Sequence, residues 1–223
     1  MAPRNRYAKS KKKKTLPIWL IVVGIVAIAA VALGVYSLLS DPTGIVTPNR
    51  PAYTTADGIH LGNPEAKVVV EEFADFQCPG CALYWKNMEP AILQDYIDTG
   101  KVYYSFHPYS FLGEESISAA KAAFCAEEQG KFWEYRDYLF GNHTGENVGD
   151  FTTKRLFFFA KKLSLDMDAF KSCFRDKATA ARVTESSDYA RSKSINLTPS
   201  FTVNGTVVNA AQLTEAIEAE LAK

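Results

Sequence analysis

The sequence predicts an α/β fold in which a long helical stretch interrupts a strand–helix–strand core, behind one N-terminal transmembrane helix. Three observations support this prediction: a β-branched run, Val68 to Val70, leads into a helix-compatible segment; short strand-like runs return only from residue 200 onward; and residues 16–39 carry no charge. A strand, a helix and a second strand in this order are expected to form a right-handed crossover.

Composition and charge narrow the functional classes. The 223 residues allow one domain or two small ones, and 47% hydrophobic residues is typical of a globular protein. Residues 1–40 carry seven basic and no acidic side chains, which leaves 18 basic and 25 acidic residues in the remainder, a net charge of −7. This acidic remainder argues against nucleic-acid binding. The four cysteines, one close pair and one distant pair, favour an oxidising compartment over the cytosol.

The N-terminal region is expected to anchor the chain in a membrane. The basic segment 1–15 stays in the cytoplasm by the positive-inside rule, which places everything after residue 40 outside. At about 1.5 Å per residue, the run 16–39 is long enough to cross a hydrocarbon core of roughly 30 Å as a helix. A cleaved signal peptide is the alternative. Residues 40–56 contain three prolines and no apolar periodicity, which predicts an extended tether.

Residues 57–223 are expected to form the folded domain. Its first half has predicted strands over 58–61, 67–73 and 101–107, and a helix over 81–98 that ends at a glycine. A helical insertion over about 110–194 follows, with helices predicted at 114–128, 131–140, 152–162, 166–175 and 177–192, and with Ser164 as the expected cap of the fourth. Strands over 200–203 and 206–208, joined by an Asn204-Gly205 hairpin turn, and a helix over 210–222 complete the domain.

The reactive thiols are expected to be Cys78 and Cys81, which lie at the junction between a predicted strand and a predicted helix. A thiol at a helix N-terminus faces unpaired backbone N–H groups and the positive end of the helix dipole, and both favour the thiolate. Pro79 suits the first helical position, and Gly80 supplies no side chain, so backbone groups alone stabilise the thiolate. Cys78 is therefore the expected nucleophile and Cys81 its resolving partner. Half of a zinc or copper site is the alternative, but the three histidines have no ligand-like spacing to this pair.

Three motifs together resemble the DsbA-like thiol–disulfide oxidoreductases, which have a thioredoxin fold with a helical insertion. They are Val70 to Cys81, Cys125 to Tyr135 and Leu197 to Phe201, and the likeness covers about residues 58–223. The resemblance implies a membrane-anchored, extracytoplasmic enzyme that introduces disulfide bonds into unfolded or reduced exported proteins without a dissociable cofactor or a metal. It also implies a membrane quinone-linked reoxidant of the DsbB or VKOR kind. Because the tether is too short to hold the dimerisation domain of related isomerases, a monomer is expected.

The resemblance assigns roles to three further residues. It implies a cis bond at Pro199, facing the disulfide, and a Thr198 backbone that pairs with bound peptide; the alternative is a trans-proline that begins a strand. It also implies a buried carboxyl at Glu72. Such a group would have a raised pKa and could relay a proton from Cys81, whereas two adjacent solvated carboxylates at a strand end are the alternative.

Cys125 and Cys173 both fall in the predicted helical insertion, too far apart to form a redox motif. An unpaired buried cysteine packs like a small hydrophobe. Two of them in one exported subdomain instead suggest a structural disulfide, which some members of the resembling family have. Two rival functions stay open: a membrane-tethered disulfide reductase or isomerase, and a non-redox peptide-binding chaperone module in which the cysteines are incidental.

Overall fold

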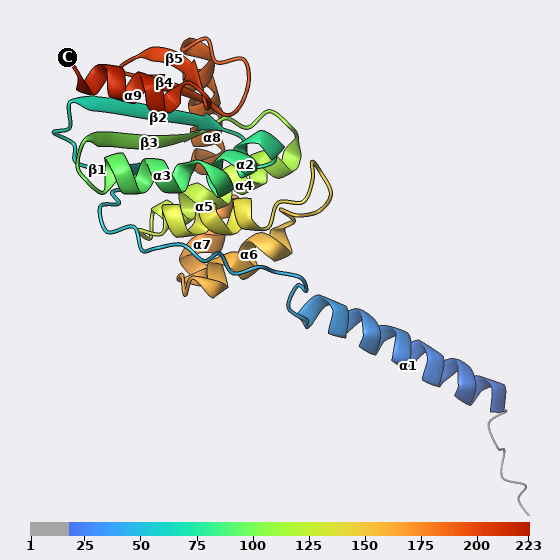
Figure 1. The fold of residues 1–223 in the computed structure, drawn as a ribbon. Coiled ribbons are helices and arrows are strands. Elements are labelled where there is room, and N and C mark those ends of the chain that lie inside the picture. The colour runs from blue at the N-terminus through green and yellow to red at the C-terminus, as the bar shows by residue number, and fades with distance from the viewer. Residues whose placement is uncertain (1–17) are drawn as a thin grey trace, which may run out of the picture. The chain divides into compact units, whose positions relative to one another are not determined.

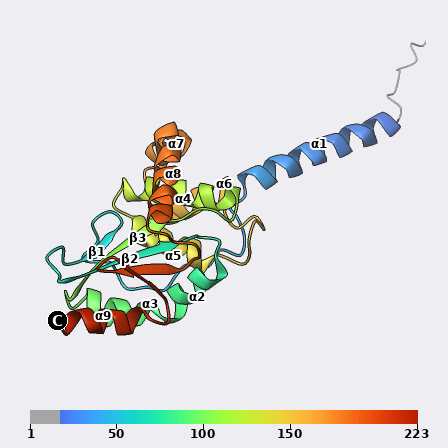
Figure 2. The same cartoon turned by 90° about the horizontal axis from the view of Figure 1, so that it is seen from above.

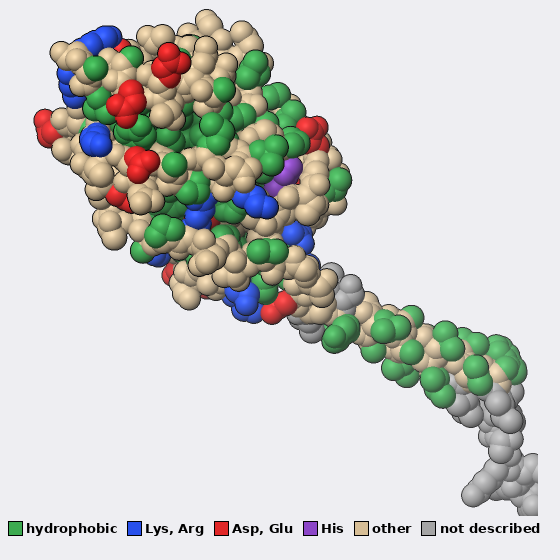
Figure 3. Space-filling model, in the orientation of Figure 1, with side chains coloured by type: hydrophobic (Ala, Val, Ile, Leu, Met, Phe, Trp, Pro, Cys, Tyr) green, Lys and Arg blue, Asp and Glu red, His purple; other side chains and the backbone are tan. Residues whose placement is uncertain are grey.

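A computed structural model describes residues 18–223, and the chain divides into two compact units, Met1–Asp41 and Pro42–Lys223. The described part of the first unit is one helix, α1 (Ile18–Leu39), with exposed hydrophobic side chains along it (Figure 3). The predicted basic segment 1–15 lies outside the described residues, as do positions 16 and 17. Over residues 18–223, none of the helices combines the length and hydropathy that a bilayer span requires. The structure therefore does not support the predicted transmembrane helix over 16–39.

The second unit is built on a five-stranded sheet with the order β1-β3-β2-β4-β5 (Figure 1). Its strands are β1 (His60–Gly62), β2 (Val68–Ala74), β3 (Val102–Pro108), β4 (Ser200–Val203) and β5 (Thr206–Asn209). The pair β2–β3 is parallel, as a crossover requires, and the other three pairs are antiparallel. The predicted hairpin between β4 and β5 is confirmed, because Asn204 and Gly205 both have positive φ values, 46° and 84°.

The helical segment between β2 and β3 differs from the continuous helix that was predicted over 81–98. Helix α2 (Pro79–Asn87) ends at Met88, and a short helix α3 (Glu89–Ile92) and a π-helical turn η1 (Leu93–Ile97) follow. Pro90 explains the break, because it has no N–H for the helical hydrogen-bond ladder and disfavours a helical conformation in the residue before it.

The predicted helical insertion is present between β3 and β4. It consists of α4 (Glu114–Glu127), α5 (Phe132–Gly141), α6 (Thr153–Lys162), α7 (Met167–Arg175) and α8 (Lys177–Ser192), and α9 (Leu213–Leu221) ends the chain. The predicted cap of α7 was wrong. Ser164 lies in a turn with φ 57°, and the Asp166 side chain accepts hydrogen bonds from the backbone N–H groups of Asp168 and Ala169 instead.

The two faces of the sheet have different cover. Figure 2 shows α2, α3 and α9 on one side of the sheet and α8 on the other. On the α8 face, Phe73 packs with Ala190 and Ile195. Because side chains alternate along a strand, the adjacent residues Glu71 and Glu72 of β2 project to opposite faces. Glu72 thus faces the layer that contains the start of α2.

Residues 42–56, which we call the strap, contain no helix or strand, as expected of a Pro-rich tether. The strap is nevertheless docked on the domain. The backbone N–H and C=O of Val46 pair with the side-chain amide of Asn142 at 2.7 and 2.8 Å, and the Thr55 hydroxyl accepts from the Gly62 N–H at 3.0 Å. The strap is extended, as predicted for the tether, but the sequence analysis did not predict that it is docked. These hydrogen bonds and apolar contacts from Ile45 and Tyr53 hold it to the core.

Candidate active site

Cys78 and Cys81 lie at the carboxyl end of β2, in the centre of the sheet. A turn in which the Cys78 N–H donates to the Asp75 carbonyl (3.0 Å) leads the chain from the strand into α2. Cys78 is the N-cap of that helix, and Pro79 takes its first position as the sequence predicts. Both cysteines are free thiols, and the Cys81 N–H donates to the Cys78 sulfur at 3.4 Å.

The two thiols differ in exposure and in acidity. Cys78 is 8% exposed and Cys81 is fully buried. A hydrogen bond from the Cys81 thiol is the main cause that lowers the pKa of Cys78 to about 6; burial opposes it, and the Thr198 side chain and the N–H groups of Cys81 and Gly80 add to it. The sequence analysis named only the backbone donors and missed the two side chains.

Cys81 has the opposite shift. Burial raises the pKa of Cys81 well above its ordinary value, and the negative charges of Cys78 and Glu72 raise it further. At neutral pH the pair therefore consists of a thiolate at Cys78, the more exposed of the two, and a fully buried neutral thiol at Cys81. This is the division that a nucleophile and a resolving cysteine need.

The loop before β4 lies against the cysteine pair. The Thr198–Pro199 peptide bond is cis, as the resemblance implied, and the Cys78 thiol donates to the Thr198 carbonyl at 3.2 Å. A Cβ atom added to Gly80 would lie 3.3 Å from Cδ of Pro199 and 3.6 Å from the Cys78 sulfur. Glycine thus permits the close approach of helix α2 to this loop.

Glu72 is buried near the resolving cysteine, on the face of β2 that meets α2. It is 1% exposed, the Tyr104 hydroxyl donates to its Oε2 at 2.8 Å, and Arg136 Nη1 lies 3.6 Å from the same oxygen. Burial raises the pKa of Glu72 to about 8, against the opposing charge of Arg136. The alternative of two solvated carboxylates is therefore wrong for Glu72.

Glu71, the neighbour of Glu72, also has hydrogen-bond partners. Its carboxylate accepts from the Tyr189 hydroxyl at 2.5 Å and from the Thr202 hydroxyl at 2.6 Å. Burial opposes ionisation of this group, but these two hydrogen bonds and the charge of Lys193 together lower its pKa. Two adjacent glutamates thus shift in opposite directions.

Sequence reasoning missed Arg136, which joins Glu72 to a buried charge cluster. Its guanidinium is fully buried and lies 2.5 Å from Glu89 Oε1 and 3.4 Å from Asp137 Oδ1. A signal was available, because Arg136 lies three positions from both Trp133 and Leu139, on a helical face that is otherwise apolar. A basic residue at such a position is buried only with a partner.

Asp75, three residues before Cys78, was also missed. Its carboxylate accepts from the Gln77 N–H at 2.8 Å, the Phe111 N–H at 2.9 Å and the Ser116 hydroxyl at 2.6 Å. It therefore ties the turn that presents Cys78 to the loop after β3 and to α4. The available signal was a charged residue within the otherwise apolar run Phe73 to Phe76, directly before the cysteines.

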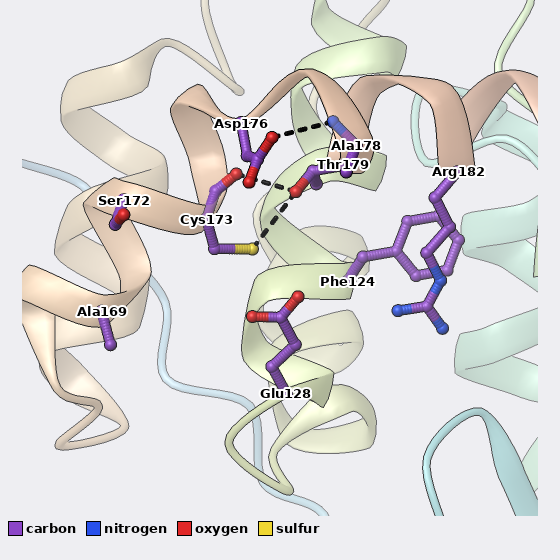
Figure 4. Close-up of a pocket in the computed structure, with 9 residues that line it drawn as sticks. All are labelled: Phe124, Glu128, Ala169, Ser172, Cys173, Asp176, Ala178, Thr179 and Arg182. Carbon is purple, nitrogen blue, oxygen red and sulfur yellow. Dashed lines mark hydrogen bonds between the residues drawn. The ribbon is translucent and has the colours of Figure 1, made fainter.

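The distant cysteine pair forms a separate region. Cys125 of α4 and Cys173 of α7 are joined by a disulfide, with their Cα atoms 5.7 Å apart. The Thr179 hydroxyl donates to the Cys173 carbonyl at 2.8 Å (Figure 4). Both residues line a cavity of about 360 Å³, together with Phe124 and Arg182. Neither Cys78 nor Cys81 lines this cavity. Because α4 and α7 both belong to the helical insertion, the bridge joins two parts of that insertion.

Comparisons with known proteins agree with this geometry. A family model described as Thioredoxin matches residues 54–223. The chain is 30% identical over 209 residues to the probable disulfide bond formation protein D of Bacillus anthracis, a match that covers 91% of this chain and 95% of that protein. The crystal structure of oxidised BdbD from Bacillus subtilis has a TM-score of 0.70 and 28% identity, and the match covers 82% of this chain and 100% of that one. The chain belongs to the DsbA-like thioredoxin family.

Membership of the DsbA-like family makes the chain a protein thiol–disulfide oxidoreductase. A further relative is the Na⁺/H⁺ antiporter NhaA 3 of Salinispora tropica, which is 34% identical over 199 residues. That match covers 86% of this chain but only 28% of the antiporter, so nothing of the antiporter's activity is carried over.

Proposed function

We propose that the enzyme introduces disulfide bonds into reduced exported proteins by exchanging a Cys78–Cys81 disulfide with their thiols. The contrast between the two thiols supports this direction most strongly. A pKa of about 6 at Cys78 stabilises the thiolate, and hence the reduced form of the pair, by about 1.4 kcal/mol at pH 7. A stabilised reduced form makes the disulfide an oxidant.

The proposed cycle starts with the oxidised enzyme. A substrate thiolate attacks the Cys78 sulfur, the Cys78–Cys81 bond breaks, and Cys81 leaves with the electron pair. A second substrate thiolate then attacks the substrate sulfur of this mixed disulfide and displaces Cys78 as the thiolate. The substrate loses two electrons and gains a disulfide, while the enzyme gains two electrons and becomes the dithiol.

Glu72 is the proposed proton donor and acceptor for Cys81. Because its pKa is about 8, it is largely protonated at pH 7 and can protonate the leaving Cys81 sulfur in the dry interior. During reoxidation the ionised form accepts the proton again. Thr198 and Pro199 are the proposed peptide contacts, because the Thr198 carbonyl accepts from the Cys78 thiol and Pro199 lies beside Gly80.

The proposed partners are reduced or unfolded exported proteins and a membrane quinone-linked reoxidant of the DsbB or VKOR kind. We place a monomeric catalytic domain on the extracytoplasmic side of the membrane. The support is the uncharged run 16–39 behind a basic segment, a run that begins two positions before the described residues. Alkaline extraction of host membranes is expected to leave the protein in the membrane pellet, whereas a fully active soluble form that begins near Ser40 would contradict the anchor.

The proposed function is tested with the oxidised enzyme and a reduced, unfolded substrate protein whose free thiols are counted over time. Wild type is expected to remove thiols in pairs, and its own pair to appear as a dithiol in equal amount. An enzyme that instead reduces native disulfides in the presence of a donor would be a reductase or isomerase. Suppression of aggregation without any loss of thiols would support the chaperone alternative.

A further inference from the structure

The strap brings two polar side chains to the buried charge cluster around Arg136. Arg50 Nη2 lies 3.3 Å from Glu89 Oε2 and donates to the Trp85 carbonyl, and its guanidinium stacks 4.5 Å above the Trp85 ring. The Tyr53 hydroxyl donates to Asp137 Oδ2 at 2.8 Å. Both residues precede residue 54, where the match to the thioredoxin family model begins. The strap therefore adds contacts that lie outside the matched part of the fold.

Arg136 connects the strap contacts to Glu72. Its guanidinium donates to Glu89 Oε2 at 2.8 Å and lies 3.6 Å from Glu72 Oε2. The Arg136 guanidinium thus contacts both Glu89, which Arg50 also contacts, and Glu72, whose charge raises the pKa of the resolving cysteine. The titratable and charged groups that face Glu72 and its partners come from every packed element: Cys81 and Tyr84 of α2, Glu89 of α3, Tyr104 of β3, Arg136 and Asp137 of α5, and Arg50 and Tyr53 of the strap.

The balance of charge in this cluster decides how well Glu72 is compensated. Three carboxyl groups, Glu72, Glu89 and Asp137, face two guanidinium groups, so the cluster has one carboxyl group more than it has guanidinium groups to compensate. Glu89 has both guanidinium groups within 3.3 Å, whereas Glu72 has one at 3.6 Å. Without Arg50, Glu89 would depend on Arg136 alone, and Arg136 would compensate Glu72 less.

We propose that the strap is part of the active site, and that Arg50 is a positioning residue that keeps the Arg136 charge available to Glu72 and so sets the pH at which Cys81 gives up its proton. Tyr53 also keeps the Arg136 charge available to Glu72, because its hydroxyl donates a hydrogen bond to Asp137. The inference rests on the proposed function, because only exchange through Cys78 and Cys81 uses this proton.

The test follows the closure of the reduced pair by glutathione disulfide. Cys78 attacks and releases one glutathione; Cys81 then loses its proton to Glu72, attacks Cys78 and releases the second glutathione. The lifetime of the mixed disulfide, measured by acid quench and mass spectrometry from pH 5 to 9, reports this second step. The rate of this step is expected to rise with pH as Glu72 ionises, and we call this part of the pH profile the Glu72 limb. Removing the Arg50 charge makes ionised Glu72 less stable, so Arg50→Gln is expected to shift the Glu72 limb to higher pH by about one unit. Closure at pH 7 would then be roughly tenfold slower. Arg50→Lys is expected to restore most of the rate.

Arg182 offers a matched control, because it also pairs with a carboxylate, Glu127 at 2.5 Å, and stacks on an aromatic ring, Phe124 at 4.1 Å. Arg182→Gln is expected to leave the profile unchanged. Glu72→Gln is expected to remove the limb, and Arg50→Gln in that background to have no further effect on it.

Tyr53→Phe keeps the ring contact with Trp133 (5.7 Å) and removes only the hydroxyl, so it supplies a second reading if Arg50→Gln does not fold. It is expected to shift the limb in the same direction by less. A wild-type profile in the Arg50 and Tyr53 variants that fold would overturn the role of the strap and leave the proposed function intact. A wild-type pair that does not exchange with glutathione disulfide at all would instead overturn the proposed function.

Discussion

The two cysteine pairs of this chain have opposite surroundings. Cys78 and Cys81 are three positions apart, unbridged, and held at a strand–helix junction where one thiol has a lowered pKa and the other a raised one. Cys125 and Cys173 are 48 positions apart, bridged, and fixed between two helices. By loop closure, the close pair would stabilise the fold by only about 2 kcal/mol and the distant pair by about 4 kcal/mol. The close pair is therefore suited to opening and closing, and the distant pair to stabilising the helical insertion.

The largest difference between the two pairs is expected in activity. Cys78→Ser removes the nucleophile and is expected to abolish oxidation of a reduced substrate protein, and Cys81→Ser to accumulate the mixed disulfide. The double variant Cys125→Ser/Cys173→Ser is expected to retain exchange under conditions where it is folded. Thiol counting on the same substrate compares all three, and undiminished activity in Cys78→Ser would refute the mechanism.

The second prediction concerns stability, for which the distant pair is expected to matter more than the close pair. Removing the distant bridge with Cys125→Ser/Cys173→Ser is expected to lower the free energy of unfolding by about 4 kcal/mol, because the unfolded chain regains the entropy of a long loop. Urea titration of wild type and variant, both with Cys78 and Cys81 reduced, measures the change. Two alkylatable thiols at positions 125 and 173 of the native wild-type protein would contradict the bridge itself.

The sequence was sufficient for local features and insufficient for long-range ones. The strand–helix junction, the hairpin and the helical insertion follow from turn residues and periodicity over short windows. The break at Met88 could have been predicted from Pro90. For the site, the motif predicted Cys78, Cys81 and Pro79 because all three lie at the N-cap or in the first turn of one helix.

The charge cluster could not be predicted in the same way. Arg50 and Glu89 are 39 positions apart, and Arg136 and Glu89 are 47 apart, so no spacing rule brings them together. Composition was also insufficient to predict the contacts of the strap. Its prolines indicate an extended chain, which is what the structure shows, but they carry no information on whether that chain is docked. Only the tertiary partners of Arg50 and Tyr53 decide this.

The third prediction compares the two faces of β2. The pKa of Glu72, about 8, lies above its ordinary value, so between about pH 4.5 and 8 the folded state binds more protons than the unfolded state, and stability falls as pH rises. Glu72→Gln lacks this loss and is expected to gain about 3 kcal/mol relative to wild type between pH 4.5 and pH 7. Urea titrations at several pH values give this difference.

Glu71→Gln is the matched control for Glu72→Gln, because it removes the neighbouring carboxylate on the opposite face. The pKa of Glu71 is lowered, so its ionised form adds stability that is present above its ordinary pKa and lost as pH falls. Glu71→Gln is therefore expected to be destabilising at pH 7. The same sign for both variants would show that burial on the two faces is alike.

The smallest predicted effect, at Gly80, concerns how oxidising the close pair is. The best-known strong oxidants of the DsbA-like family have histidine at this position, and an imidazole here can donate to the Cys78 thiolate, which now depends on Cys81, Thr198 and backbone N–H groups. Gly80→His is expected to lower the thiolate pKa from about 6 by about one unit, which corresponds to about 1.4 kcal/mol and makes the couple about 30 mV more oxidising.

Any side chain at this position also crowds Pro199, because its Cβ would lie 3.3 Å from the ring. Gly80→Ala separates the two effects, since it adds the Cβ without the donor and is expected to leave the pKa near that of wild type. Ultraviolet thiolate titrations and glutathione equilibria of the three proteins decide the matter: an equal shift in both variants would assign the change to the displaced Pro199 loop, and an unchanged pKa in Gly80→His would show that the Cys81 and Thr198 donors already saturate the thiolate.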